Sequence, residues 1–199
     1  ELDNDLVKYL SEEFAATSRF KIIAEDVLKV DYQQFKQFPM RWIGNLPYNI
    51  STPFLLSLIA MKDDMVDGVF MLQYEVALRI VASVGSKQYG RLAVALSRFF
   101  SSDIILEVPA TAFDPPPAVH SAVVRMVPKK TDAVDEVFEK EFLSVVARAF
   151  GQRRKMLRKI FQKDIQASDW QVIAIDASLR PEQLTPEDFE RLTAWFLQR

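Results

Sequence analysis

Hydrophobic runs alternate with amphipathic stretches through the first 130 residues of the chain. Runs of strand-forming residues occupy positions 20–24, 41–44 and 68–73. A helix is expected after the second run, where Thr52 can cap and Pro53 can take the first helical position. Another helix is expected over 90–100, because its leucines share one face with Phe99. Strands that alternate with helices predict a parallel α/β sheet.

The pattern changes further along the chain. Two more strands are expected over 104–108 and 119–127, and this pair is expected to join the sheet as an antiparallel addition. Strand signals then end, and three helices are expected over 135–150, 152–164 and 186–197. Thr185 can cap the last of these in a variant of the capping box. The chain is therefore divided into an α/β domain, 1–130, and a small all-helical domain, 131–199.

The composition excludes several classes of protein. Hydrophobic residues make up 49% of the 199 positions, which suits one sizeable domain or one domain with an appendage. No apolar stretch approaches the ~20 residues of a membrane-spanning helix, and the acidic start does not resemble a secretion signal. A cytoplasmic protein without a membrane partner is therefore expected. Without cysteine, and with His120 as the sole histidine, disulfides, thiol nucleophiles and thiolate or histidine metal sites are excluded.

The overall charge bears on nucleic-acid binding. A net charge of −2 argues mildly against a nucleic-acid partner, because phosphate binding usually accompanies a basic excess. This objection weakens where basic side chains gather in one region. Residues 152–159 are such a region, and Arg153, Arg154, Lys155 and Lys159 are its candidate phosphate contacts. The simpler alternative is a solvated helix face opposite the apolar stripe of Leu157, Ile160 and Phe161.

The segment 45–48 is the candidate for chemistry. It follows an expected strand and precedes an expected helix, and open α/β sheets bind ligands at the carboxyl ends of their strands. The Asn45 amide oxygen and the Leu46 carbonyl, held extended by Pro47, could accept both hydrogens of an exocyclic amine. They would turn the lone pair of an adenine N6 toward an electrophile while Tyr48 stacks on the base. Taken alone, the tetrapeptide could equally be an ordinary turn.

Further segments extend this motif into a family resemblance. They are 44–53 (GNLPYNISTP), 70–76 (FMLQYEV), 89–92 (YGRL), 113–121 (FDPPPAVHS) and 152–155 (QRRK). In this order, over the whole chain, they resemble the bacterial small-subunit ribosomal RNA adenine N6,N6-dimethyltransferases, the KsgA family. The resemblance implies a Rossmann-like domain that uses S-adenosylmethionine. It further implies transfer of two methyl groups to N6 of each of two adjacent adenosines, in a hairpin loop near the 3′ end of small-subunit rRNA.

The resemblance also implies partners and residue roles. The enzyme would act in small-subunit biogenesis, as a monomer, on rRNA within a ribosomal particle, with 131–199 as its RNA-binding domain. The catalytic residues would be Asn45, Leu46, Pro47, Tyr48 and Phe113, with Phe113 covering the base opposite Tyr48. Glu1 would bind the two ribose hydroxyls of the cofactor, Asp26 would accept from its adenine, and Asn45 would border it. From the residues alone, Glu1 is a surface charge, and Asp26 is as good a helix cap as a ligand, with Glu25 the adjacent alternative.

One block of the family pattern does not occur in this sequence. None of the five glycines forms a G-x-G with another, so the first strand–glycine loop–helix of the fold is expected to be missing. The chain is therefore interpreted as N-terminally truncated and, by itself, as inactive and poor at binding the cofactor.

Two rival functions remain open. One is a large-subunit rRNA adenine methyltransferase of the macrolide-resistance type, and the other is a non-catalytic ribosome-assembly factor of the same fold. Leu46 and the segment 113–117 favour the small-subunit enzyme over the first rival. Intact Asn45, Tyr48 and Phe113 argue against the second, because a decayed site need not keep them.

Overall fold

The computed structural model of the protein describes residues 1–35, 39–130 and 136–199. Its strands are β1 (Met40–Asn45), β2 (Met65–Gln73), β3 (Phe100–Val108) and β4 (Ser121–Pro128). Its α-helices are α1 (Asn4–Glu13), α2 (Ser51–Ser57), α3 (Tyr74–Ile80), α4 (Arg91–Phe99), α5 (Glu136–Phe150), α6 (Leu157–Ile160), α7 (Asp169–Ile173) and α8 (Pro186–Leu197). Short 3-10 helices are η1 (Tyr32–Phe35), η2 (Leu58–Asp64), η3 (Ala110–Ala112) and η4 (Pro181–Gln183). The predicted domain boundary falls beside residues 131–135, which lie outside the described part.

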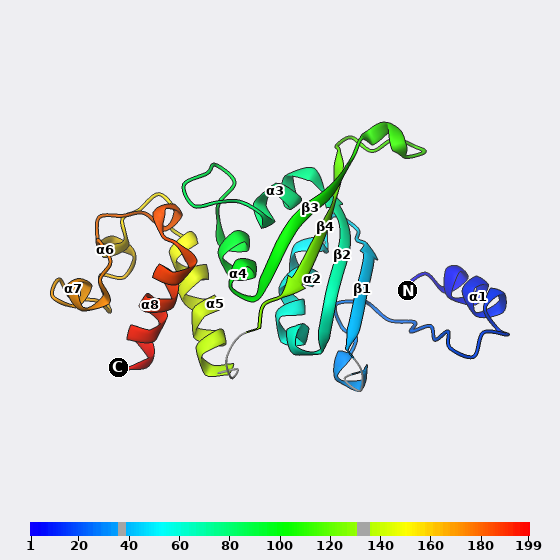
Figure 1. Ribbon diagram of the computed structural model, residues 1–199, viewed down its shortest axis with the longest axis horizontal. Coiled ribbons are helices and arrows are strands. Elements are labelled where there is room, and N and C mark those ends of the chain that lie inside the picture. The colour runs from blue at the N-terminus through cyan, green and yellow to red at the C-terminus, as the bar shows by residue number, and fades with distance from the viewer. Residues whose placement is uncertain (36–38, 131–135) are drawn as a thin grey trace.

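The four strands form one mixed sheet in the order β1-β2-β4-β3. β1 runs parallel to β2, whereas β4 runs antiparallel to both β2 and β3. The expected α/β sheet with a late antiparallel addition is therefore confirmed. Figure 1 shows α3 and α4 between this sheet and the C-terminal helices α5 and α8, with α1 at the other end of the molecule beyond β1.

The apolar core runs from the sheet into the helical region through α4. Phe70 of β2, Phe99 of α4, Phe142 of α5 and Phe189 of α8 are all fully buried and belong to one cluster of apolar side chains. The rings of Phe99 and Phe142 meet edge to face with their centroids 6.2 Å apart. Edge-to-face pairs add to the free energy gained by burying their area. The helical region is thus packed against the sheet and shares one apolar core with it.

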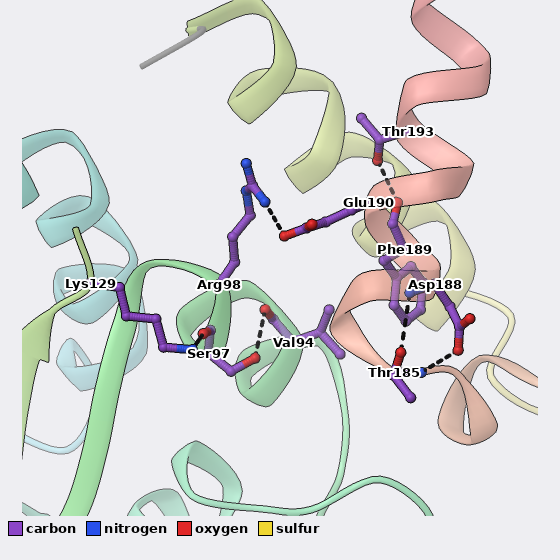
Figure 2. Close-up of polar contacts among 9 residues, drawn as sticks. All are labelled: Val94, Ser97, Arg98, Lys129, Thr185, Asp188, Phe189, Glu190 and Thr193. Carbon is purple, nitrogen blue, oxygen red and sulfur yellow. Dashed lines mark hydrogen bonds and ion pairs between the residues drawn. The ribbon is translucent and has the colours of Figure 1, made fainter. Parts of the chain in front are cut away.

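Polar contacts reinforce this packing. Arg98 of α4 forms an ion pair with Glu190 of α8 (Figure 2). The ammonium of Lys62 in η2, whose side chain is 4% exposed, lies 3.0 Å from the Glu139 carboxylate of α5. The Tyr89 hydroxyl donates to the Leu184 carbonyl over 2.8 Å in the buried interior. These contacts fix the position of the C-terminal helices relative to η2, α4 and the loop before α4.

Two expectations for the first 60 residues are wrong. Residues 20–24 form no strand, and the Ile23 carbonyl accepts from the amino group of Glu1 over 2.9 Å instead of from a neighbouring strand. Thr52 is not a cap, because α2 begins at Ser51, two residues before the expected first helical residue Pro53, and Ile50 is at the cap position. The Pro47 carbonyl accepts from the Ile50 N–H (3.1 Å) and the Ser51 hydroxyl (3.0 Å), which starts the helix early.

Of the three helices expected in the C-terminal region, two are confirmed and one is wrong. The helices expected over 135–150 and 186–197 are found as α5 and α8, and Thr185 and Asp188 cap α8 as expected. The helix expected over 152–164 is wrong, because only the four-residue α6 forms there. The Leu157 and Arg158 N–H groups donate to the carbonyls of Leu179 and Ala177, which redirects the backbone away from a continuous helix.

No helix within residues 1–35, 39–130 and 136–199 is both long and apolar enough to cross a membrane.

Candidate active site

The candidate motif follows directly from β1, at the carboxyl end of the parallel pair formed with β2. Asn45 ends β1 opposite Met71 of β2. The Leu46 side chain is buried in the core, and its N–H donates to the Met71 carbonyl over 3.4 Å. A side chain at Gly44 would approach the Phe70 ring to 3.1 Å, so glycine allows β1 to pack closely here. Burial on one side and hydrogen bonds on the other hold the motif backbone in place.

A cavity of about 320 Å³ opens at this motif. It is lined by 45–48 together with Met71, Phe113, Pro115, Pro117 and Ser121. The structure therefore brings together all five residues expected to be catalytic. Met71 and Ser121 were missed by sequence reasoning, because they come from other strands and only the sheet register places them here. Ser121 is buried, and its hydroxyl lies 3.3 Å from that of Tyr48.

The chemistry of this cavity suits a flat, neutral ligand. Tyr48 is 41% exposed and half-buried Phe113 lies in the connection between β3 and β4, so two aromatic side chains border the space. None of the described residues that line it carries a carboxylate, an amine or an imidazole. The cavity offers stacking surfaces and amide, hydroxyl and carbonyl groups, so it can position a base without a strong general base.

Glu1, one of the three expected cofactor residues, lines a different cavity. A cavity of about 350 Å³ is lined by Glu1, Glu25, Phe20, Ile22 and Tyr32 among others. Its apolar walls and two carboxylates fit a nucleoside, because a purine needs apolar surfaces and ribose hydroxyls need acceptors. The Glu1 carboxylate accepts from the Asp3 and Leu2 N–H groups, which lowers its pKa and keeps it charged.

Asp26 does not line this nucleoside-sized cavity. Its carboxylate accepts from the Leu28 N–H over 3.0 Å, as in an Asx turn. Glu25, the neighbour passed over in favour of Asp26, lines the cavity instead. The role assigned to Asp26 stays a prediction, and Asn45 lines only the first cavity of the two.

The expected RNA-binding residues line neither of these two cavities; Arg153, Arg154 and Lys155 lie in the turn between α5 and α6, and Lys159 lies in α6. Arg154, Lys155 and Lys159 are exposed. Arg153 is half-buried, because its guanidinium lies 2.6 Å from the Glu182 carboxylate and donates to the Lys87 carbonyl over 3.2 Å. Arg153 thereby ties the helical region to the loop between α3 and α4.

A basic groove lies between α3, α4 and this turn, and sequence reasoning did not find it. Its volume is about 830 Å³, and four cationic side chains line it together with one carboxylate. These side chains are Arg79, Lys87, Arg91, Arg153 and Glu75. The cations are spread over 75 positions of sequence, so only the fold brings them together.

Comparisons with known proteins agree with this geometry. Residues 1–198 match the family described as "Ribosomal RNA adenine dimethylase". The chain is 44% identical over 199 residues to "Ribosomal RNA small subunit methyltransferase A" of Thiobacillus denitrificans, an alignment that covers 100% of this chain and 77% of that protein.

Two solved structures share the fold at low sequence identity. A dimethyladenosine transferase from Plasmodium falciparum matches with a TM-score of 0.79 and 22% identity, over 100% of this chain and 80% of that one. The 23S rRNA methyltransferase ErmE matches with a TM-score of 0.69 and 19% identity, over 98% of this chain and 79% of that one. At these identities the likeness concerns the fold alone.

Proposed function

The chain belongs to the ribosomal RNA adenine dimethylase family, and we propose that its target is a pair of adjacent adenosines in a 3′-terminal hairpin loop of small-subunit rRNA. Each adenosine receives two methyl groups on N6, and S-adenosylmethionine is the methyl donor. The observation that carries the proposal is the cavity that gathers residues 45–48 and Phe113 around one space.

The target base lies between Tyr48 and Phe113 in this mechanism. Stacking on aromatic side chains is worth about 1–3 kcal/mol per base and accepts any flat ring. Selection of adenine therefore falls to the hydrogen-bond acceptors at the end of the slot. The Asn45 amide oxygen and the Leu46 carbonyl accept the two N6 hydrogens, which turns the nitrogen lone pair out of the ring plane.

Positioning supplies most of the rate enhancement. The cofactor, when bound, provides a sulfonium methyl group that is already strongly electrophilic. The chain's own task is to hold N6 in line with that methyl carbon, and holding reactants in an attack geometry is a large effect in its own right. The Leu46 backbone is suited to this task because its buried side chain and its bond to Met71 prevent it from moving.

The nucleoside part of the cofactor would be held by the N-terminal segment. Glu1 would accept from the ribose hydroxyls, and its lowered pKa keeps it an ionised acceptor. The apolar side chains around it would cover the adenine ring. Asp26 was expected to accept from the adenine, and Glu25 is the alternative that faces the same cavity.

The proposed partner is a ribosomal small-subunit particle in the cytoplasm, met by a monomeric enzyme. Exposed Arg154, Lys155 and Lys159 would contact rRNA phosphates, and neutralised phosphates release counterions that make binding depend on salt. Arg153 would act by holding the turn in place through Glu182.

The test is methyl transfer by the protein with the expected first strand–glycine loop–helix in place to isolated small and large ribosomal subunits, each prepared from cells that lack the modification. The proposal predicts dimethyladenosine in small-subunit rRNA alone, at two adjacent positions mapped by mass spectrometry of nuclease fragments. Modification of large subunits instead would support the macrolide-resistance type of enzyme. Particle binding without methyl transfer would support an assembly factor.

A further inference from the structure

Another cavity adjoins the cavity of about 320 Å³ between Tyr48 and Phe113, which is called the adenine slot below. Its volume is about 510 Å³, and Ser121 lines both cavities. Its walls come from the carboxyl ends of β2 and β3 and from the segment that leads into β4. The two spaces are therefore neighbours on either side of one buried serine.

The walls of this second cavity are held by the sheet. Ser121 of β4 stands opposite Gln73 of β2 and Val108 of β3 in the register. The Tyr74 N–H donates to the His120 carbonyl over 3.0 Å, which ties the start of α3 to the segment before β4. A site built on paired strand ends keeps its geometry when a ligand enters.

The side chains in the cavity favour a flat ligand with N–H donors. The Tyr74 hydroxyl donates to the Glu107 carboxylate over 3.1 Å, which orients that carboxylate next to the Tyr74 ring. Val119, 41% exposed, adds apolar surface. Glu75 also lines the cavity, but its carboxylate is paired with Arg79 at 2.5 Å. Glu107 is therefore the acceptor best placed for a ligand.

The same side chains argue against a phosphate ligand. None of the described residues that line this cavity is a lysine or an arginine. A carboxylate repels phosphate, whereas it accepts well from amino groups on the edge of a nucleobase. An aromatic ring beside it supplies the stacking surface that unpaired bases use on proteins. Adenine, guanine and cytosine carry such an amino group, and uracil does not.

We propose that this cavity is a second base subsite, which holds the nucleotide next to the target adenosine by stacking on Tyr74 and by accepting its exocyclic amine at Glu107. The proposal rests on the proposed function, since it assigns the neighbour of the base in the slot. Two adjacent unpaired bases of one strand then occupy two adjacent cavities on either side of Ser121.

The subsite has a consequence for the rates of methylation. Because the strand runs through the two cavities in one direction, the subsite holds the partner adenosine while one particular member of the pair is in the slot. An unmodified partner donates an N6 hydrogen to Glu107, whereas a dimethylated partner has none left to donate. A hydrogen bond to a charged group is worth about a ten- to hundredfold change in an equilibrium or rate constant. That member is accordingly dimethylated faster before its partner is modified than after.

The test is a time course of both modifications on small subunits by the protein with the expected first strand–glycine loop–helix in place, with mass spectrometry that reports which of the two adenosines is dimethylated. In wild type, one position is expected to be modified more slowly in particles whose other adenosine is already dimethylated. Glu107→Ala should slow that position about ten- to hundredfold in particles whose other adenosine is unmodified, and Glu107→Gln, which keeps a neutral acceptor, should slow it less; cofactor affinity should stay unchanged. Asp103→Asn, the same change at an exposed position of β3 outside the cavity, is the matched control.

The possible outcomes distinguish a failure of the proposed function from a failure of the subsite. If the protein with that N-terminal unit forms no dimethyladenosine on small subunits, the proposed function itself is wrong. If it is active but both Glu107 variants leave both positions unchanged, the subsite is refuted. Equal slowing with an unmodified and with a dimethylated partner also refutes it, because a dimethylated partner has no hydrogen to donate to Glu107.

Discussion

Tyr89 offers a sharp test of how the helical region is attached to the sheet domain. It lies in the loop before α4, is 2% exposed, and its hydroxyl donates to the Leu184 carbonyl over 2.8 Å. Its ring also meets Phe150 edge to face, with centroids 6.2 Å apart. Tyr89→Phe removes only the hydroxyl, so the ring contact survives and the Leu184 carbonyl loses its donor in a fully buried position.

The expected loss of stability follows from the burial of both Tyr89 and Leu184. A buried polar group left without its partner costs about 1–3 kcal/mol. We expect Tyr89→Phe to lower the free energy of unfolding by about 2 kcal/mol, or roughly 4–8 °C in melting temperature for a domain of this size. Urea denaturation and calorimetry measure the two quantities. Tyr9→Phe, at a position that is 59% exposed, is the control and should change neither.

The difference in the free energy of unfolding between wild type and Tyr89→Phe should also depend on pH. Burial raises the pKa of the Tyr89 phenol above its ordinary value of 10.0, and nearby Glu187 and Asp188 raise it further. The stability that Tyr89 contributes is therefore complete below pH ~10 and is lost as pH rises through the raised pKa, by about 1.4 kcal/mol per unit. The gap between wild type and Tyr89→Phe should narrow from pH 9 to 11. A constant gap, or no gap at neutral pH, would refute this account of Tyr89.

Three further variants test other contacts. Glu139→Ala should cost about 3 kcal/mol in urea unfolding, because it leaves the buried Lys62 ammonium with the exposed Asp63 carboxylate in place of its close partner, while Lys62→Met with Glu139→Leu should recover most of this; equal losses would contradict the argument. In methylation kinetics Tyr48→Phe should keep most activity, and Tyr48→Ala should lose about 1–3 kcal/mol of base binding; equal effects would exclude stacking. Lys155→Glu with Lys159→Glu should weaken particle binding most at low salt, and unchanged affinity there would leave an ordinary solvated surface.

The sequence predicted those elements that depend on contacts between residues close together in the chain. The cap of α8 was predictable because Thr185 and Asp188 are three residues apart and each bonds to the other's backbone. The turn before α6 was not, since the Leu157 N–H donates to Leu179, far along the chain. Residues 20–24 have strand-forming side chains, but a strand also needs a hydrogen-bonded neighbour, and local propensity carries no information about one.

The residues of the candidate site likewise fall into those that local sequence could predict and those that only the fold brings together. Asn45 and Tyr48 were predictable because strand, motif and helix follow one another within a few residues. Ser121 reaches the same cavity only through the β2–β4 register, and Glu107 joins Tyr74 only through the β3–β4 pairing. The choice of Asp26 over Glu25 depended on which side chain faces a cavity, and that is set by backbone geometry.

Asn45→Ala tests the central claim, that this cavity positions an adenine amine for methyl transfer. The measurement is steady-state methylation of small subunits with kcat and KM resolved, alongside Asn49→Ala as an exposed neighbour outside the cavity. The account predicts a large fall in kcat with little change in KM, because the Asn45 acceptor matters most as the amine becomes pyramidal. A rise in KM with kcat intact would contradict it, since Asn45 would then contribute to binding and not to the reaction.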